Sequence, residues 1–305
     1  MANKHSIKDW LIAARPWSFP ASAMPVVAGT AYLFCIGKEP DWLMALWALV
    51  TIVVFHAAGN TWSDYNDYKK GVDREDTIGG TSIVSGEFKP EEIRQYAMIL
   101  LAIAVVSGLL ITYCAGFPVL YIGFAGFLLT LLYPWFKYRA LGDFDIFLTY
   151  SLLPLLGTSY VATGDIYWEV CWLALPVGLI TIGILHANNM RDTQQDRRAN
   201  IETFAMRIGA RASAVIYAFE VIFPFVAVAV CVVAGIFPIL SLITFSAFKI
   251  AWQNAMKAMK YQQQGMEILR GVDEKTAQLQ LLFSLLLSIS FVVSGFVDNN
   301  FNWFD

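Results

Sequence analysis

Residues 56–73 have the sequence HAAGNTWSDYNDYKKGVD and directly follow the apolar run 42–55. If the helix formed by this run continues to about Tyr68, Asn60 and Asp64 are four residues apart and Asp64 and Asp67 three. The three side chains then lie on one helix face. Charged groups at the point where an apolar helix leaves a bilayer are costly and are usually functional. The stretch therefore predicts a binding face at the end of a membrane helix.

A second copy of the pattern lies about 130 residues later in the chain. The apolar run 168–185 is followed by HANNMRDTQQD at residues 186–196. Here Asn189 and Asp192 are three residues apart, and Asp192 and Asp196 four. His56 and His186 open the two copies, which we call the first and second acidic stripes.

The composition indicates a membrane protein. The chain has 305 residues, of which 57% are hydrophobic and 15% charged, and its mean hydropathy is +0.56. A soluble domain carries about 25% charged residues. The apolar residues occur in blocks long enough to cross ~30 Å of hydrocarbon as helices, and nothing alternates with the period of barrel strands. We therefore predict one all-α, polytopic domain over residues 1–305. Its nine expected spans are Pro20–Ile36, Trp42–Asn60, Tyr96–Ala115, Pro118–Trp135, Ile146–Ala162, Trp168–His186, Ala214–Ala234, Ile236–Trp252 and Leu279–Val297.

The distribution of Lys and Arg predicts the orientation in the lipid bilayer. With nine spans, nearly all of these residues fall on the side of the N-terminus, and Lys38 is the exception. The positive-inside rule then places the N-terminus, the even connections and both acidic stripes in the cytosol. We expect the protein in a bacterial cytoplasmic membrane. No basic run suggests a nucleic-acid partner.

Four carboxylates at two helix C-termini would repel one another and the helix dipoles, so they require cations. Oxygen ligands favour a hard ion, and Mg²⁺ is usually completed by water and substrate phosphate. Nearby basic residues would be superfluous around a bare metal, but they suit a metal-bound anion such as a diphosphate. These residues are Lys69, Lys70, Lys137, Arg191, Arg197, Arg198 and Arg207.

A diphosphate bound inside a helical bundle in lipid is expected to carry an apolar tail. Mg²⁺ and basic groups can stabilise a diphosphate as it leaves an allylic carbon. The allylic cation then needs a dry pocket with aromatic walls. Trp62, Tyr65, Tyr68 and Tyr150 are candidates for these walls, although packing is the commoner role of a single aromatic residue in a chain with 15% aromatics.

Several motifs resemble a known family. The patterns NxxxDYxDYxxGxD at residues 60–73 and NNxRDxxxD at residues 188–196 resemble the two signatures of the UbiA superfamily of intramembrane prenyltransferases. AARPWSFPAS at residues 13–22 and TFAMRIG at residues 203–209 look like its branch that prenylates 1,4-dihydroxy-2-naphthoate in menaquinone synthesis. The resemblance implies a helical bundle around a central cavity with a cytosolic cap. It also implies two Mg²⁺ ions and transfer of a polyprenyl group from its diphosphate to an aromatic acceptor.

The resulting assignment gives each candidate residue a role. Asp64, Asp67, Asp192 and Asp196 are the expected catalytic residues, and with Asn60 and Asn189 they are the expected Mg²⁺ ligands. The expected substrate-binding residues are Tyr65, Lys69, Asp73, Lys137, Tyr150, Asn188, Arg191, Arg197 and Arg207. His56 and His186 could be catalytic or simply bonded to a neighbouring helix. Glu220, inside a span, is a further functional candidate.

Two alternatives remain open at this point. The acceptor could be another phenolic acid or a glycerol phosphate lipid, since the branch usually has basic residues where this chain reads Asn200-Ile201-Glu202. A secondary transporter or divalent-cation carrier would also have repeated polar helix breaks. Against a transporter, the stripes lie at the cytosolic helix ends rather than at the midplane. The spans between the two copies also preserve their orientation instead of inverting it.

Overall fold

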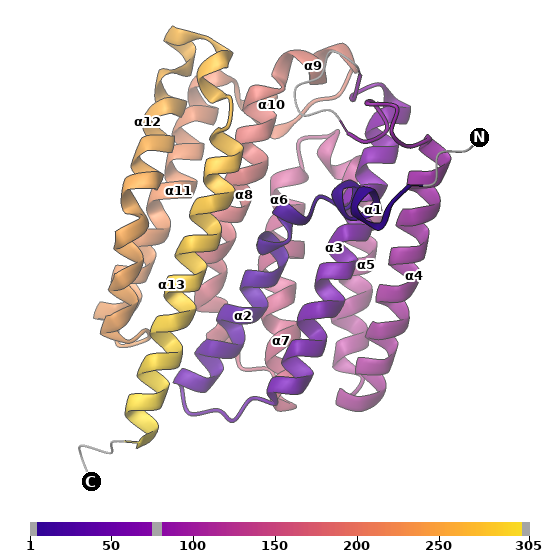
Figure 1. Cartoon of the computed structure of the whole chain (residues 1–305). Helices are drawn as coiled ribbons and strands as arrows, with labels where there is room; N and C mark the ends of the chain where they lie inside the picture. Colours follow the sequence, from indigo (N-terminus) through magenta and orange to yellow (C-terminus); the bar gives the residue numbers. More distant parts are fainter. Residues whose placement is uncertain (1–4, 75–80, 301–305) are drawn as a thin grey trace.

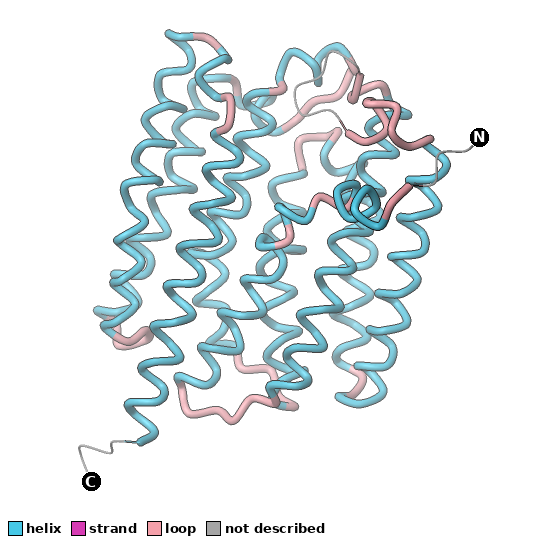
Figure 2. The backbone as a smooth tube through the Cα atoms, viewed as in Figure 1, coloured by secondary structure: helices cyan, strands magenta, loops and turns pink. Residues whose placement is uncertain are grey.

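The computed structural model describes residues 5–74 and 81–300. Within these residues every regular element is a helix, and the long helices stand side by side as one bundle (Figures 1 and 2). The all-α prediction is confirmed. Part of the connection between the first acidic stripe and the next span, residues 75–80, lies outside the described residues.

The described chain begins with the short helix α1 (Ile7–Ala13) and a 3₁₀ turn η1 (Pro16–Ser18), which precede the first long helix. The first half of the bundle is α2 (Pro20–Cys35), α3 (Trp42–Lys70), α4 (Pro90–Ala115), α5 (Pro118–Lys137), α6 (Gly142–Phe147), η2 (Leu148–Leu152) and α7 (Leu153–Thr163). The second half is η3 (Trp168–Leu173), α8 (Ala174–Arg191), α9 (Thr193–Arg198), α10 (Phe204–Ile208), α11 (Ala210–Val233), η4 (Ile239–Ala247), α12 (Phe248–Gln264), η5 (Met266–Leu269) and α13 (Val272–Asn300).

Among the described residues, eight helical segments are long and apolar enough to cross a membrane. They correspond to eight of the nine predicted spans. The ninth, Ile236–Trp252, is not among them. It forms η4 and the start of α12, which packs against α11 and α13 (Figure 1). The segment is therefore helical and part of the same bundle, but it is not apolar enough to count as a membrane span.

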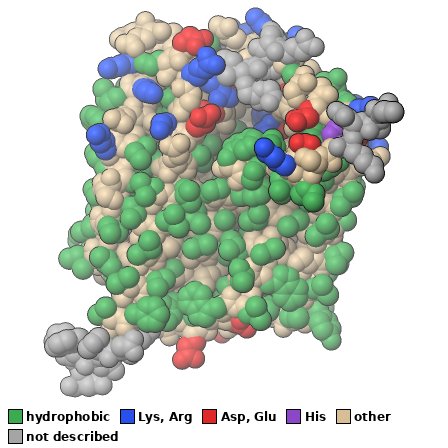
Figure 3. All heavy atoms as spheres, viewed as in Figure 1, with side chains coloured by type: hydrophobic (Ala, Val, Ile, Leu, Met, Phe, Trp, Pro, Cys, Tyr) green, Lys and Arg blue, Asp and Glu red, His purple; other side chains and the backbone are tan. Residues whose placement is uncertain are grey.

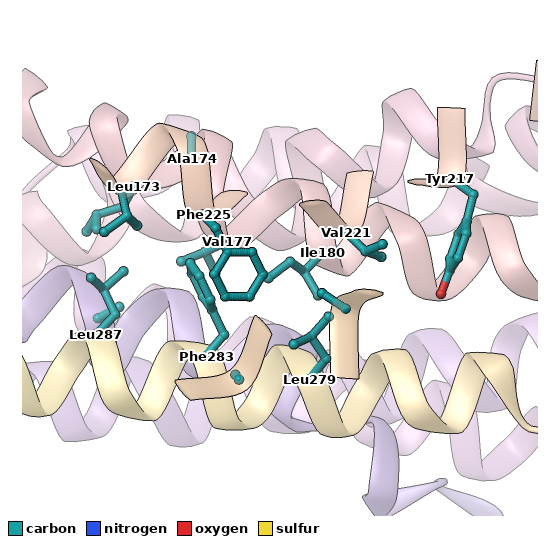
Figure 4. Close-up of a cluster of buried hydrophobic side chains, with 14 of the residues drawn as sticks. Leu173, Ala174, Val177, Ile180, Tyr217, Val221, Phe225, Leu279, Phe283 and Leu287 are labelled. Atoms are coloured by element: carbon teal, nitrogen blue, oxygen red, sulfur yellow. The ribbon is translucent and has the colours of Figure 1, made fainter. Parts of the chain in front are cut away.

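The largest cluster of buried hydrophobic side chains lies mainly in the second half of the bundle. Buried side chains of α8, α11 and α13 meet there, including Ile180, Phe225 and Phe283 (Figure 4). In a bilayer, where lipid tails are as apolar as leucine, van der Waals packing rather than water exclusion drives such contacts. This half gives the second acidic stripe a rigid support.

Local breaks in the helices bring polar groups into the bundle. Arg15, between α1 and η1, has φ 57°, a left-handed conformation that is uncommon for a residue with a side chain. The following residue is Pro16, which disfavours the α conformation at Arg15. Between α6 and α7, the element η2 is a π-helical turn, and such turns occur frequently at functional sites.

The surface has distinct regions. On the face seen in Figure 3, hydrophobic side chains cover the middle of the bundle, and Lys and Arg gather mainly toward the end where α9 and α10 lie. This distribution is typical of a protein that spans a bilayer with one basic side.

Candidate active site

Both acidic stripes line one polar cavity of about 210 Å³ near the basic end of the bundle. Asn60 and Asp67 come from α3, Asn189 from α8, and Asp192 and Asp196 from the segment that follows α8. Two stretches that are about 130 residues apart in the sequence therefore meet at one site. The remaining member of the stripes, Asp64, lies directly behind a side chain that lines the cavity.

That side chain is Arg15, which forms an ion pair with Asp64. The Asp64 side chain is 6% exposed and that of Arg15 is 35% exposed. One turn earlier on α3, the Asn60 amide donates to the backbone oxygen of Ala14 at 3.0 Å and to the hydroxyl of Ser18 at 2.9 Å. The N-terminal segment is thus attached to the first stripe, and it brings a cation into the cavity.

Asp67 is held by two strong hydrogen bonds from the end of α5. Lys137 Nζ donates to its Oδ2 at 2.7 Å, and the Tyr138 hydroxyl donates to its Oδ1 at 2.7 Å. The side chains of Asp67 and Lys137 are 8% and 16% exposed. Lys137 also lines the cavity, so the pair presents both signs of charge to a bound molecule.

The second stripe does not lie on a single helix. α8 ends at Arg191, Asp192 is its C-cap, and Asp196 lies on the separate helix α9. The Thr193 hydroxyl contributes to this break, because it donates to the backbone oxygens of Asn189 and Met190. The expectation of one continuous helical face is therefore wrong here, although all three polar side chains still reach the cavity.

Arg191 connects the second stripe to α13. Its Nε and Nη2 donate to the two oxygens of Asp192 at 2.7 and 2.8 Å, and its Nη1 donates to Asp273 Oδ2 at 2.6 Å. A bidentate arginine of this kind fixes both the position and the charge of a carboxylate.

Negative charge exceeds positive charge around the cavity. Its lining contains the carboxylates Asp67, Asp73, Asp145, Asp192 and Asp196 and the cationic side chains Arg15, Lys137 and Arg191. Burial, together with the neighbouring carboxylates, raises the pKa of Asp73 to about 6 and that of Asp196 to about 7. Asp145 is 1% exposed, and its Oδ1 has no hydrogen-bond partner. Surplus carboxylates and amide oxygens in a partly closed cavity are the ligands that Mg²⁺ takes. The residues present therefore fit a magnesium site.

A second, apolar cavity of about 390 Å³ lies beside the polar one. It is lined by residues of α2, α3, α4, α5 and α7, among them Phe55, Val105 and Phe127. Thr149 and Tyr150, both on the π-helical turn η2, line both cavities. The π turn thus forms the boundary at which a polar chamber meets an apolar one.

The structure also places the predicted substrate-binding residues. Asp73, Lys137, Tyr150, Asn188 and Arg191 line the polar cavity. The other four predicted substrate-binding residues do not line this cavity: Tyr65, Lys69, Arg197 and Arg207.

Each of these four has a different environment from the one expected. The Tyr65 ring packs against the cluster around Phe88, and Lys69 Nζ lies 5.9 Å from the centre of that ring. Arg197 is exposed. It lies on α9, a separate helix, and not on a continuation of α8. Arg207 is exposed and paired with Glu202 at 2.7 Å.

Sequence reasoning missed several groups that the structure brings to the site. Arg15 was counted only as a basic residue before the first span, yet its place in the RP pair was a usable signal of a special backbone conformation. Asp145, at the start of an apolar segment, was also overlooked. No pattern in the sequence pointed to the contacts of Tyr138 or Asp273 with the stripes, because both depend on packing between distant helices.

The two histidines that open the stripes are both buried and hydrogen-bonded. His56 Nδ1 lies 2.9 Å from the Ser22 hydroxyl, and its Nε2 lies 3.3 Å from the Ser18 hydroxyl. His56 also lines the apolar cavity and packs edge-on against Tyr150. These contacts fit a histidine that links α3 to α2 and supports the cavity wall.

Comparisons with known proteins identify the family to which this chain belongs. Residues 22–268 match the model of the UbiA prenyltransferase family, and the chain belongs to this family. Over 228 residues the chain is 30% identical to UbiA prenyltransferase domain-containing protein 1 of Xenopus tropicalis, a match that covers 73% of this chain. It is 27% identical to the Homo sapiens protein of the same name over 296 residues, which covers 94% of this chain and 84% of the relative. The chain spans 66% of the Xenopus relative, just under two thirds of its length.

A solved structure supports the fold. A UbiA homolog from Archaeoglobus fulgidus bound to DMAPP and Mg²⁺ matches with a TM-score of 0.62 and 12% identity, covering 92% of this chain and 99% of that chain. The superfamily that the motifs predicted is confirmed by the family match over residues 22–268. The two relatives named above are animal proteins, and these matches do not support the naphthoate branch or a bacterial membrane in particular.

Proposed function

We propose that this protein transfers a polyprenyl group from its diphosphate to an aromatic acceptor in a reaction that requires Mg²⁺. The observation that supports this most directly is the pair of adjoining cavities. A polar cavity lined by both acidic stripes shares Thr149 and Tyr150 with an apolar cavity between membrane helices. A prenyl diphosphate has one charged end and one hydrocarbon end, and the two cavities match these two parts.

Five of the six expected metal ligands line the polar cavity, and the sixth, Asp64, lies behind Arg15 at the cavity wall. The expected Mg²⁺ ligands are Asn60, Asp64, Asp67, Asn189, Asp192 and Asp196. When bound, Mg²⁺ would neutralise charge on the diphosphate and support its departure. Arg15, Lys137 and Arg191 line the same cavity, where each is paired with a carboxylate of the stripes. When these carboxylates bind Mg²⁺, the three cations would be free to contact the phosphate oxygens.

The reaction itself requires positioning more than covalent help from the protein. The bond between the allylic carbon and the diphosphate oxygen breaks, and diphosphate leaves with the bonding electrons. A carbon–carbon bond forms to the ring, which loses either a proton or, for a ring carboxylate, carbon dioxide. The Tyr150 ring lies where the cavities meet and offers an aromatic wall to the allylic cation. The apolar lining keeps water away from that cation.

For the acceptor we favour 1,4-dihydroxy-2-naphthoate, on the resemblance of residues 13–22 and 203–209 to that branch. The basic end of the bundle, where the polar cavity lies, is the end that the positive-inside rule assigns to the cytoplasm. Water-soluble acceptors and released diphosphate would then exchange with the cytoplasm, and the prenyl tail would enter from the bilayer.

A product assay tests the function. Purified protein in detergent is incubated with Mg²⁺, labelled polyprenyl diphosphates of graded length and a panel of acceptors, and the lipid product is analysed by mass spectrometry. The panel contains dihydroxynaphthoate, 4-hydroxybenzoate and a glycerol phosphate lipid. We expect a prenylated naphthoquinol that has lost carbon dioxide. A product with another acceptor would correct the acceptor alone. Absence of product with every acceptor, together with Mg²⁺ flux into vesicles, would instead support the carrier alternative.

Two variants test the metal assignment. Asp64→Asn and Asp192→Asn should each abolish turnover while the protein remains folded and monodisperse in detergent. Asp41→Asn is the matched control. Asp41 caps the opposite end of α3, where its Oδ1 accepts from the backbone of Leu43 and Met44, and asparagine caps helices equally well. Full activity of the Asp64 or Asp192 variant with Mg²⁺ present would refute the proposed ligand set.

A further inference from the structure

A second cluster of possible metal ligands lies behind the wall of the polar cavity. His186 of α8, Glu220 of α11 and Asp143 of α6 are 0%, 4% and 9% exposed. His186 Nδ1 is 2.9 Å from Glu220 Oε1 and 3.5 Å from Asp143 Oδ2. One ligand atom from each residue lies within 4.8 Å of the other two. The three residues do not line either of the two cavities described above.

The charges in this cluster are not balanced by the protein. In the part of the chain that the structure describes, neither Asp143 nor Glu220 forms an ion pair with a lysine or arginine. Asp143 Oδ2 and Glu220 Oε2 are buried without hydrogen-bond partners. Two buried carboxylates beside one imidazole require compensating positive charge, which a proton or a bound metal ion can supply, because an uncompensated charge in the interior is strongly unfavourable.

The hydrogen bond on the far side of the imidazole indicates which cation fits. His186 Nε2 lies 2.8 Å from the hydroxyl of Ser213, a fully buried residue of α11. When Nε2–H donates to Ser213, the lone pair of Nδ1 points at the two carboxylates. Histidines that bind metals usually donate their other N–H to a neighbouring polar group in this way.

The spacing also suits a metal. Bonds of about 2.0–2.1 Å in tetrahedral geometry separate two ligand atoms by about 3.3 Å. The observed separations between Nδ1 and the carboxylate oxygens, 2.9 and 3.5 Å, bracket this distance. A divalent ion with two carboxylates and a neutral imidazole is electrically neutral, which suits a site among membrane helices.

We propose that Asp143, His186 and Glu220 bind a divalent transition-metal ion of the zinc class, separate from the ions of the catalytic cavity. The imidazole nitrogen distinguishes the two sites, because nitrogen ligands favour zinc-like ions whereas the oxygen ligands of the stripes favour Mg²⁺. This inference does not depend on the prenyl transfer reaction.

The buried site is coupled to the catalytic cavity through one side chain. Asn189, a member of the second stripe, donates from Nδ2 to Asp143 Oδ1 at 3.5 Å and lines the cavity. An ion that fixes Asp143 therefore also fixes the Asn189 amide.

Metal content measured under competition tests the proposal. The full-length protein in detergent is loaded with Co²⁺, a spectroscopic substitute for Zn²⁺, in a large excess of Mg²⁺ that occupies the oxygen-only site. After gel filtration, we expect one equivalent of Co²⁺ per chain, with the visible absorption of a four-coordinate ion. Loading with Cu²⁺ and recording nitrogen hyperfine coupling identifies the imidazole in the unmodified protein, so this result does not require a variant that folds.

Variants then assign the ligands. Asp143→Asn, His186→Gln and Glu220→Gln should each weaken Co²⁺ retention at least tenfold, and His186→Gln should also remove the nitrogen coupling. His5→Gln is the matched control. His5 belongs to the N-terminal segment and lies near Glu92, so its replacement should not change the amount of Co²⁺ that the protein retains. The proposal is overturned if the unmodified protein retains no Co²⁺, or if the retained ion is insensitive to the three ligand substitutions. If His186 is instead protonated and no metal binds, the unmodified protein will retain no Co²⁺.

Discussion

Replacement of Asp67 by asparagine gives a quantitative test of the proposed site. The substitution preserves shape and removes the negative charge that faces Lys137. In the structure Asp67 accepts two hydrogen bonds of 2.7 Å, one of them from a buried ammonium group. A hydrogen bond to a charged group contributes about 1.5–3 kcal/mol, and asparagine can still accept one of the two bonds. We therefore expect Asp67→Asn to lower the free energy of unfolding by about 1–2 kcal/mol.

The expected loss of turnover is much larger than this loss of stability can explain. A protein with about 5–15 kcal/mol of stability remains almost fully folded after losing 1–2 kcal/mol. If the Asp67 carboxylate holds a cation at the diphosphate, its loss should reduce kcat by about 10²–10³-fold. Tyr138→Phe is the control, because it removes one hydrogen bond to the same carboxylate but leaves its charge. We expect it to cost about 1 kcal/mol and to keep most of the turnover.

The assay combines thermal unfolding in detergent with initial rates of labelled prenyl transfer at saturating Mg²⁺. The double variant Asp67→Asn/Lys137→Met supplies the decisive comparison. If Asp67 serves only to neutralise Lys137, removing both charges restores turnover. Recovery of turnover in the double variant, or equal losses of turnover in Asp67→Asn and Tyr138→Phe, would refute the reasoning.

Three further predictions follow from the packing and charge of the structure. Gly178→Ala should lower the free energy of unfolding by about 1–3 kcal/mol, since the added Cβ would lie 2.5 Å from Ser151 Oγ. Gly183→Ala on the same helix is the control in a thermal unfolding assay, because its Cβ would meet no atom closer than 3.4 Å. Gly123→Leu should shift donor preference toward shorter prenyl chains, because a Cβ at Gly123 meets nothing within 4 Å and the added side chain enters the apolar cavity; an unchanged ranking of kcat/KM across donor lengths would contradict this. Without Mg²⁺, the raised pKa values of Asp73 (about 6) and Asp196 (about 7) mean that these two groups stabilise the fold most below about pH 4. Their contribution to the free energy of unfolding should fall progressively up to about pH 7, because the folded state holds these protons more tightly than the unfolded chain. Melting temperatures recorded with EDTA and with Mg²⁺ should differ most at neutral pH, and a difference independent of pH would count against cation binding by these carboxylates.

Much of the architecture could be predicted from the sequence, because an apolar block of bilayer length has few alternatives to a helix. Both ends of α2 and α5 and the C-terminal end of α4 agree with prediction to within two residues, whereas α4 begins six residues earlier than predicted. The convergence of the two stripes also followed from the repeat of His, Asn and Asp after two long apolar runs. The segment at 236–252 was harder to assign, because polar residues in a packed helix lower hydropathy without changing secondary structure.

The parts of the site that could not be predicted depend on contacts between distant segments. Arg15 reaches Asp64 only because the backbone turns into a left-handed conformation before Pro16. The cluster of Asp143, His186 and Glu220 requires three helices to meet, and no spacing along the chain reveals it. The break after Asp192 was also missed, since DTQQD reads as helical when the Thr193 side chain is ignored.

The π-helical turn η2 has a consequence for how this family can diversify. Each residue of an α-helix turns the chain by about 100° around the helix axis. An inserted residue therefore normally rotates every side chain that follows it. A π turn accommodates one additional residue locally. The helix on one side of η2 carries Asp143 and Asp145, and the helix on the other side carries Leu153 and Gly157, which line the apolar cavity. If the apolar cavity holds a hydrocarbon tail as proposed, changes in the half of this span beyond η2 can reshape that cavity while the acidic half keeps its rotational setting.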